Sequence, residues 1–325
     1  MEAFLEALYD HVLDVASVLL SAPINISDKF YFVFLLTFVG LAYISYRLYY
    51  RQPNKKFFSF LFPKKIYWHK SARIDYGIYL INLFISPLLL IGAGLQTFLS
   101  IGIAEWLIDL NDGRAVFTGN WGATTFLIFI IGYTLAADLS VYLIHRFHHR
   151  SDVFWPIHAL HHSAEVMTPM TLFRKHPLWN LMAHSLSMTF TGIFQGLFVF
   201  IFYGVPGVEV LFGINTFYVL FNFFGANLRH SHVWLSWGNT LSHLFISPAM
   251  HQIHHDPKRM QMNYGEVFAI WDWMFGTLYI PQTKETFEIG LGQGTQNPHQ
   301  TLAKAYTVPI IESAIQIRNK LARRK

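Results

Sequence analysis

The sequence predicts an all-α, polytopic membrane protein with about four to five membrane-embedded helices and a histidine-rich helical cap on the cytosolic side. Hydrophobic residues make up 53% of the 325 residues and charged residues only 13%, whereas a soluble domain carries about a quarter charged residues. Several apolar runs approach the roughly 20 residues that a helix needs to cross the hydrocarbon core. Three short segments rich in histidine lie after or between these runs.

Residues 1–22 form the first predicted element, an amphipathic helix on the outer membrane surface. Apolar residues recur in it at helical spacing, and acidic residues stand where a cleavable signal peptide would have a basic start. Five apolar segments follow, and a Gly- and Pro-containing turn at 203–207 joins the last two as a tight hairpin. The predicted membrane-embedded segments are 30–50, 76–100 with a kink at Pro87, 121–143, 181–202 and 208–226.

The charges of the connecting loops predict the orientation in the membrane. Lysines and arginines are concentrated between the first two segments, so this loop is expected to face the cytosol. The loop at 101–120 is mainly acidic and is expected to face outward. The alternation then delivers all three histidine clusters to the cytosolic face of a bacterial inner membrane or an endoplasmic reticulum. The net charge of +5 is therefore read as an orientation signal rather than as evidence for nucleic-acid binding.

After residue 227 the chain becomes a mixture of polar and aromatic residues. The segment 270–275 contains two tryptophans and is expected to pack at the membrane interface. The segment 309–325 is expected to form a basic amphipathic helix suited to an anionic membrane surface. The predicted regions are an N-terminal membrane anchor (1–120), a catalytic domain with the histidine clusters (121–285), and a C-terminal loop and helix (286–325).

The spacing within the three histidine clusters places imidazoles on one face of a helix. Each cluster contains a pair four residues apart, and the second and third clusters contain an i, i+3, i+4 triplet. Eight imidazoles are more than one tetrahedral zinc ion needs, so the pattern predicts two metal ions in a shared pocket. The predicted ligands are His145, His149, His158, His161, His162, His251, His254 and His255, with His230 completing the second metal's set.

Two more residues share the helix face of the first cluster. Asp138, Tyr142, His145 and His149 lie at i, i+4, i+7 and i+11. Asp138 is expected to orient a metal-bound imidazole through its free N–H, and Asp138 and Tyr142 are the predicted catalytic residues. Glu165 is a further candidate for supporting a ligand. The alternative for the first cluster alone is a pair of interfacial histidines beside basic residues.

The remaining histidines give weaker signals. Three of them stay open between supporting a ligand and lying at the surface: His148, His232 and His243. His176 is a candidate ligand or substrate-contacting residue, and His184 is a candidate for a functional role or for a hydrogen bond between helices. No role in the site is expected for His11, His69 and His299.

The identity of the metal follows by exclusion. The chain has no cysteine, which removes thiolate zinc sites, iron–sulfur clusters and haem thiolate. Many imidazoles with few carboxylates suit iron, copper or zinc. Zinc would catalyse hydrolysis with three ligands and one open position, whereas two irons can activate O2 and attack an unactivated C–H bond of a lipid. The alternatives are a membrane zinc-dependent hydrolase, a non-redox metal-binding protein, and a helical scaffold without catalysis.

The combined motifs resemble the fatty acid hydroxylase / sterol desaturase superfamily over roughly residues 125–280. The resemblance rests on Asp138-x3-Tyr142-x2-His145-Arg146-x2-His149, Trp155-x2-His158-x2-His161-His162-Ser163, Arg174-x-His176-Pro177, His230-Ser231-His232-Val233, His251-x2-His254-His255 and Trp271-Asp272-x2-Phe275-Gly276-Thr277. Two positions depart from the family pattern. His232 stands where many members have asparagine, and Asn227 stands where many have a further histidine, so the ligand count at the second iron is open.

The resemblance implies a helical membrane fold with a di-iron centre on the cytosolic face, and O2-dependent hydroxylation or desaturation of a lipid. Members of the superfamily act on sterols, sphingolipid acyl chains, carotenoids and alkylglycerol ethers. We expect two iron ions, O2 as co-substrate, a membrane lipid as substrate, and an external electron donor of the cytochrome b5 or ferredoxin type with its reductase. The sequence leaves open the particular lipid, the choice between hydroxylation and desaturation, and the oligomeric state.

Overall fold

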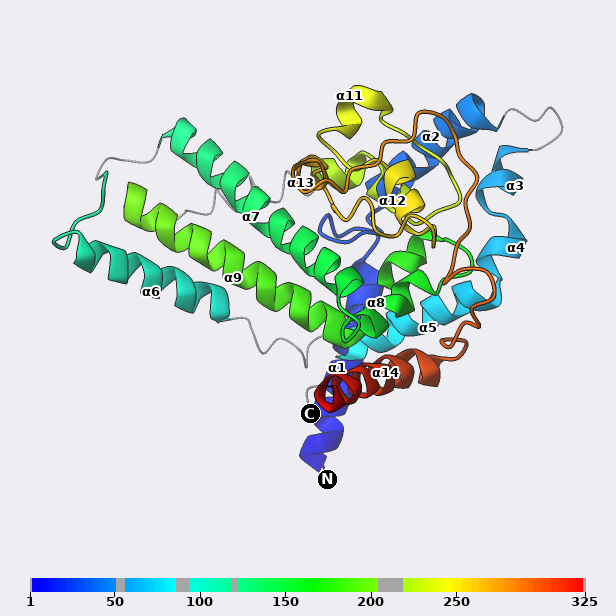
Figure 1. Ribbon diagram of the computed structural model, residues 1–325, viewed down its shortest axis with the longest axis horizontal. Coiled ribbons are helices and arrows are strands. Elements are labelled where there is room, and N and C mark those ends of the chain that lie inside the picture. Colours follow the sequence, from blue (N-terminus) through cyan, green and yellow to red (C-terminus); the bar gives the residue numbers. More distant parts are fainter. Residues whose placement is uncertain (1, 51–55, 86–93, 118–121, 204–218, 324–325) are drawn as a thin grey trace.

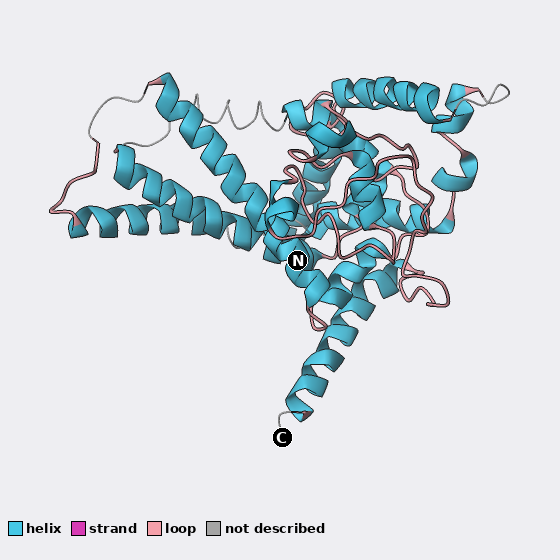
Figure 2. Ribbon diagram, turned by 45° about the horizontal axis from the view of Figure 1, so that its top comes forward, coloured by secondary structure: helices cyan, strands magenta, loops and turns pink. Residues whose placement is uncertain are grey.

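The computed structural model describes residues 2–50, 56–85, 94–117, 122–203 and 219–323. Every regular element in these ranges is a helix (Figure 2), which confirms the all-α fold class. The longer helices are α1 (Glu2–Ser21), α2 (Phe32–Tyr49), α5 (Lys70–Ile85), α6 (Leu95–Leu110), α7 (Ala123–Arg150), α9 (Pro177–Phe202) and α14 (Leu302–Ala322). The shorter ones are α3 (Phe57–Leu61), α4 (Lys64–Tyr67), α8 (Trp155–His162), η2 (Pro169–Phe173), η3 (Ala226–Leu228), α11 (Gly238–Ser242), α12 (Pro248–His254) and α13 (Ile270–Met274).

Three of the described helices, α2, α7 and α9, are long and apolar enough to cross a membrane. They coincide with the first, third and fourth predicted segments, so an integral membrane protein is supported. The second predicted segment does not match one described helix, because α5 ends at Ile85 and α6 begins at Leu95. The kink expected at Pro87 lies outside the described residues, as does most of the fifth segment, 208–226.

Helices α6, α7 and α9 form an arm that extends away from the rest of the molecule (Figure 1). The arm is tightly packed because α9 carries Gly192 and Gly196 where it meets α6. A Cβ atom at either position would lie 2.9 Å from a backbone oxygen of α6, that of Gln96 or Ser100. Small residues with this spacing let membrane helices approach closely and gain van der Waals contact. The C-terminal end of α7, at Arg150, and the N-terminal end of α9, at Pro177, both lie at the histidine-rich region.

The short helices form a cap around the ends of α7 and α9 (Figure 1). Two of them begin where the sequence places a proline. Helix α8 has Pro156 in its first turn, and α12 begins at Pro248 with the Ser247 side chain accepting a hydrogen bond from the Met250 N–H. Proline is favoured there because the first-turn N–H groups have no partner within the helix. Where α8 and α12 begin therefore determines the directions in which the histidines of the second and third clusters point.

The C-terminal helix differs from its predicted bounds of 309–325. Helix α14 begins at Leu302, because the Thr301 side chain accepts a hydrogen bond from the Lys304 N–H and caps the first turn. Pro309 therefore lies inside the helix rather than at its start. Helix α14 packs against α8 and α5, and the Tyr306 hydroxyl donates to the Asn82 side chain at 2.9 Å. This packing supports α8, which carries the second cluster.

Candidate metal centre

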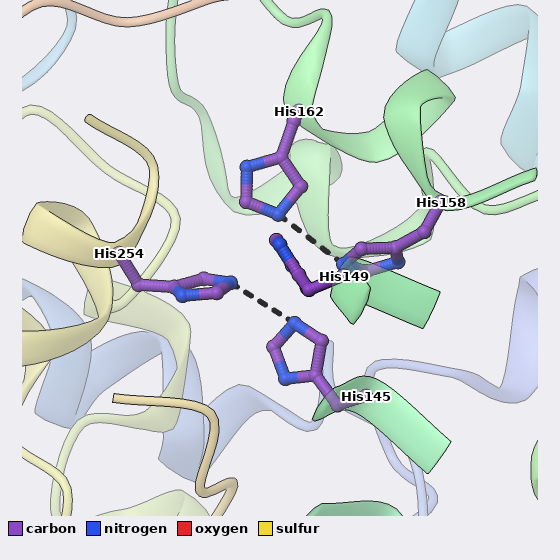
Figure 3. Close-up of side chains that lie close together, drawn as sticks. All are labelled: His145, His149, His158, His162 and His254. Carbon is purple, nitrogen blue, oxygen red and sulfur yellow. Dashed lines mark hydrogen bonds between the residues drawn. The ribbon is translucent and has the colours of Figure 1, made fainter. Parts of the chain in front are cut away.

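The cap gathers nine buried histidines into two groups, and all nine are among the predicted ligands. The first group consists of His145, His149, His158, His162 and His254, and the second of His161, His230, His251 and His255. Within each group, one nitrogen of every ring lies within 4.8 Å of those of the other members. Figure 3 shows the five rings of the first group, which come from α7, α8 and α12 and point toward a common centre. Each group could hold one metal ion.

The two HxxHH segments divide their histidines between the groups. In α8, His158 and His162 join the first group, and His161 joins the second. In the third cluster the assignment is reversed, because His254 joins the first group while the pair four residues apart, His251 and His255, joins the second. Two adjacent residues of one short helix point to opposite sides, so each segment contributes to both groups. The groups therefore lie side by side in one pocket, as the stacked rings of His162 and His255 show, with centroids 4.6 Å apart.

Backbone carbonyls fix the orientation of two rings in the first group. His145 donates its Nδ1 hydrogen to the Tyr264 carbonyl at 2.7 Å, and His254 donates its Nδ1 hydrogen to the Met262 carbonyl at 2.7 Å. A carbonyl oxygen can only accept, so both Nδ1 atoms carry hydrogen and both neutral rings present a lone pair at Nε2. These two Nε2 atoms nevertheless lie 2.9 Å apart. Two lone pairs at this distance repel unless a cation lies between them.

The other close ring nitrogens have a similar spacing. The Nε2 atoms of His158 and His162 are 3.2 Å apart, and the His230 Nε2 lies 3.1 Å from that of His161 and 2.9 Å from that of His251. Two nitrogens bonded to one metal ion at about 2.1 Å lie about 3.0 Å apart at a right angle and about 3.4 Å apart in a tetrahedron. Three of the four separations, 2.9, 2.9 and 3.1 Å, are closer to the right-angle value, and the fourth, 3.2 Å, lies between the two.

Several ring nitrogens in the groups have no partner among the described residues. Both nitrogens of His149 and both of His255 are buried without a hydrogen bond. The His149 ring lies within 5.0 Å, between centroids, of each of the other four rings of its group. Buried polar atoms without partners are unfavourable, and a metal ion in each group would satisfy them. The residues therefore fit a pair of metal ions.

Burial keeps the imidazoles neutral. The pKa of His254 is lowered from 6.5 to about 4 by burial, against the opposing effect of its bond to Met262. Burial first, and then neighbouring imidazoles, lower the pKa well below its usual value in His158, His161, His162, His230, His251 and His255. Only neutral imidazole binds metal, so the site is prepared for metal at neutral pH.

Asp138 has a different role from the predicted one. Its carboxylate accepts hydrogen bonds from the backbone N–H groups of Val267 and Phe268 at 3.0 and 3.1 Å, and from the Trp271 indole at 2.9 Å. It therefore holds the loop after Tyr264 rather than orienting an imidazole. The Tyr264 carbonyl orients His145. Asp138 affects this carbonyl only indirectly, by holding the loop that follows Tyr264.

Tyr142, a predicted catalytic residue, and Glu165, a predicted support of a ligand, also lie outside both groups. The Tyr142 hydroxyl is 3.0 Å from the Thr277 hydroxyl and accepts a hydrogen bond from Arg146. Its catalytic role stays a prediction. Glu165 is exposed and accepts a hydrogen bond from the Asn297 side chain, so its predicted support of a ligand is wrong.

Asp272 is a positioning residue that the sequence reasoning did not single out. Its carboxylate accepts hydrogen bonds from the backbone N–H groups of Tyr264 and Gly265, both at 2.8 Å, and from the Thr277 hydroxyl at 2.6 Å. Burial raises the pKa of Asp272 to about 6, against these hydrogen bonds. The Trp271-Asp272 motif was the available signal. Asp272 and Asp138 together fix the loop whose carbonyl orients His145.

The structure also places the histidines whose roles were open. His148 is buried, so a surface position is excluded, and its Nδ1 donates to the Ile144 carbonyl of its own helix. His176 caps α9 by accepting a hydrogen bond from the Leu178 N–H, and its Nε2 donates to the Tyr306 carbonyl. Because both nitrogens of His176 are occupied, it is not a ligand. His232 donates to the Phe60 carbonyl at 2.8 Å, and His184 and His243 are exposed and outside both groups.

Comparison with known protein families gives one finding. Residues 130–277 match the family model described as Fatty acid hydroxylase. The matched region runs from within α7 to the residue after Gly276 and contains all nine clustered histidines. The comparisons with curated proteins and with solved structures give no significant match.

Proposed function

We propose, from the membership of residues 130–277 in the fatty acid hydroxylase family, that this protein is a di-iron, O2-dependent oxygenase of membrane lipids. The family and the buried histidine groups support a metal-binding lipid hydroxylase or desaturase. The proposal adds that the metal is iron, that there are two ions per chain, and that O2 is the oxidant.

The observation that carries the proposal is the pair of adjacent groups of neutral imidazoles. The first group offers five nitrogens and the second four, and neither contains a carboxylate or thiolate. Five ligands and near-right-angle nitrogen separations favour a metal ion with more than four ligands over tetrahedral zinc. When bound, the two irons would supply the redox chemistry that reduces O2 and breaks an unactivated C–H bond.

The protein's own contribution is to hold and orient the imidazole rings and to keep them away from water. The carbonyls of Tyr264 and Met262 fix the rings of His145 and His254 so that each presents Nε2 to the centre. All nine rings are buried, which excludes water from the reacting position. Water exclusion matters because a strong oxidant would otherwise be quenched before it reaches the lipid.

We propose that an apolar cavity of about 340 Å³ receives the lipid chain. Its lining includes Phe224, Leu241, Phe245 and Arg229, the last of which immediately precedes His230. This volume lies in the range of small-molecule sites. The aliphatic and aromatic residues of the lining include several that are partly exposed on the outside of the cap, with Phe224 at 58% and Leu241 at 52%. The cavity is therefore suited to an acyl, ether or sterol chain that enters from the bilayer.

The hairpin predicted for the last two apolar segments forms only part of the wall of this cavity. The cavity lining includes residues 220, 221 and 224–226 from the end of the fifth predicted segment but no residue of α9. We propose that α11 and the loop before α12 take the place of that second wall. The electron donor is proposed to be an external protein that approaches from the cytosolic face, where loop charge places the cap.

The test is turnover under ¹⁸O2 in lipid nanodiscs with ferrous iron and a chemical or protein reductant. Hydroxylation transfers one ¹⁸O atom to the lipid, whereas desaturation removes two hydrogens and leaves no label. The control is His176→Ala, which changes a buried histidine of the cap outside both groups. Lipid turnover by this control but not by His161→Ala supports the proposal. Lipid hydrolysis without O2, restored by zinc, would establish the hydrolase alternative instead.

A further inference from the structure

A second cavity, of about 320 Å³, lies between α5, η2 and α9. Its lining includes Leu83, Leu172 and Phe173 but carries more polar and charged groups than that of the apolar cavity. Lys29, Lys175 and Glu266 provide the charges, and Tyr79, Asn82 and Asn180 provide further hydrogen-bonding groups. Two ammonium groups facing one carboxylate leave the lining with an excess of positive charge. These charged and hydrogen-bonding groups suit the polar part of a ligand better than a hydrocarbon chain.

The polar and apolar cavities are neighbours. The Phe221 ring lines the apolar cavity, and it lies 5.7 Å from the Lys29 ammonium and 4.7 Å from the Arg229 guanidinium. Glu266 lines one cavity and Val267, the next residue, lines the other. A single amphipathic molecule could therefore place a charged group among the cations and an apolar chain in the apolar cavity.

Lys29 donates a hydrogen bond to the Asn222 side chain at 2.6 Å, so the charges considered next are those of Lys175, Arg229 and Glu266. No ion pair of Lys175, Arg229 or Glu266 occurs among the described residues. Arg229 is only 4% exposed, and its Nη2 atom is buried without a hydrogen-bond partner. The Lys175 ammonium lies over the Trp179 ring at 4.3 Å. A buried cation whose nitrogen has no hydrogen-bond partner is unfavourable, so a ligand can satisfy the charge of Arg229, with the partly buried Lys175 beside it.

The charges nevertheless affect one another through space. Burial alone would raise the pKa of Glu266, but the charges of Lys175, Arg229 and Lys29 lower it below its usual value. Burial lowers the pKa of Lys29 to about 8, with Glu266, Arg229, Lys175 and Asp28 acting on it as well. The other nearby acid, Asp138, already accepts three hydrogen bonds. Glu266 therefore remains a carboxylate, and at least two cations are left for an anion.

We propose that the junction of the two cavities binds an amphipathic molecule whose anionic group, a carboxylate or a phosphate, is held by Lys175 and Arg229 while its chain fills the apolar cavity. The inference names the substrate class of the proposed oxygenase and so rests on that function. Arg229 adjoins His230, and the Lys175 charge acts on both His161 and His230. The anionic group is thus held beside the second histidine group.

The test measures binding of four twelve-carbon probes to the metal-loaded protein in phosphatidylcholine nanodiscs. The probes are dodecyl phosphate, dodecanoate, dodecanol and dodecyltrimethylammonium, and binding is read from the rise of the unfolding temperature with probe concentration. We expect the two anionic probes to bind wild type and the neutral and cationic probes to bind at least tenfold more weakly. The stronger of the two anionic probes identifies the head as phosphate or carboxylate.

Variants of opposite charge effect make the test specific. Lys175→Met should weaken anionic binding by about tenfold, and Lys175→Arg should restore most of it. Glu266→Gln should strengthen it by roughly threefold or more, because a like charge is removed. The control is Lys304→Met, at an exposed lysine of α14, and should leave binding unchanged. A general loss of structure cannot produce both weakening and strengthening.

Two results would overturn the inference. One is equal binding of charged and uncharged probes by wild type, and the other is weakening by Glu266→Gln to the same extent as by Lys175→Met. Metal content measured on the same samples separates this inference from the proposed function. Charge-selective binding with no iron would contradict the oxygenase but retain the anion site, whereas two irons without charge selectivity would contradict the anion site alone.

Discussion

A buried ion pair holds the second histidine cluster in place, and removing its acid should destabilise the protein strongly. Arg174 and Asp75 are both fully buried, with Nη1 and Oδ1 2.7 Å apart. Arg174 also donates from Nε to the Leu160 carbonyl at 2.8 Å and from Nη2 to the Ser163 hydroxyl at 2.9 Å. The second carboxylate oxygen of Asp75 accepts a hydrogen bond from the Thr171 hydroxyl. The pair thus links α5 and η2 to α8.

The expected effect of Asp75→Asn is a loss of about 3–5 kcal/mol in the free energy of unfolding, because the Arg174 charge stays buried without a counter-ion. The matched control is Asp152→Asn, whose partner Lys320 lies 3.5 Å away and whose side chain is 74% exposed. An exposed pair contributes about 0–1 kcal/mol, so the control should change little. The variant Arg174→Met combined with Asp75→Asn should lose less than the sum of the two single changes, by about 1–3 kcal/mol.

The assay is unfolding of detergent-solubilised protein by denaturant, followed by tryptophan fluorescence, with metal content measured in parallel. Metal affinity should fall with stability, because α8 carries three of the histidines. A loss of under about 1 kcal/mol for Asp75→Asn, or strict additivity in the double variant, would refute the assignment of this pair as the support of α8.

Three further predictions concern packing, capping and pH. Gly196→Ala should cost about 1–3 kcal/mol, because its Cβ would meet the Ser100 carbonyl, whereas Gly40→Ala has open space and should cost nothing in the same thermal unfolding assay. His176→Ala should lose about 1 kcal/mol with the cap of α9 but retain both metals by elemental analysis; loss of metal would show that it is a ligand. His299 is buried with neither ring nitrogen bonded among the described residues, and burial, then Arg174 and His176, lower its pKa from 6.5 to about 4. The unfolded chain binds a proton at this ring as pH falls below 6.5, whereas the folded chain does so only near pH 4. Wild type therefore loses about 2 kcal/mol of its free energy of unfolding from this ring between pH 7 and pH 5. Denaturant unfolding at the two pH values should show a correspondingly smaller loss for His299→Leu, and equal losses would contradict the low pKa.

The sequence was sufficient to predict which histidines gather in one pocket because the periodicity within each cluster is local, but it did not predict their division into two groups. The i, i+3, i+4 spacing places His158, His161 and His162 near one face of α8, but the structure assigns His161 to the second group and the other two to the first. Which histidines of different clusters meet depends on how α7, α8 and α12 pack. No spacing rule within one helix contains that information, so the division between His254 and its neighbour His255 appeared only in the structure.

Long-range polar contacts were the main part of the site that the sequence did not reveal. The Tyr264 and Met262 carbonyls orient two rings, but a backbone carbonyl is common to all residues and leaves no mark in a motif. Asp138 was expected to orient an imidazole, whereas its partners are backbone N–H groups about 130 residues later and the Trp271 indole. The same reasoning explains why the cavity beside Lys175 and Glu266 was not predicted, since its lining comes from separate parts of the chain.

The most direct test of the account is the metal content of the purified protein, measured by elemental analysis on wild type, His161→Ala and His176→Ala together. The account predicts about two irons per chain in wild type, because there are two separate histidine groups. It predicts loss of iron in His161→Ala, whose ring belongs to the second group, and about two irons in His176→Ala. About one zinc and no iron per chain in wild type, with no oxygen consumption after reconstitution with ferrous iron, would contradict it.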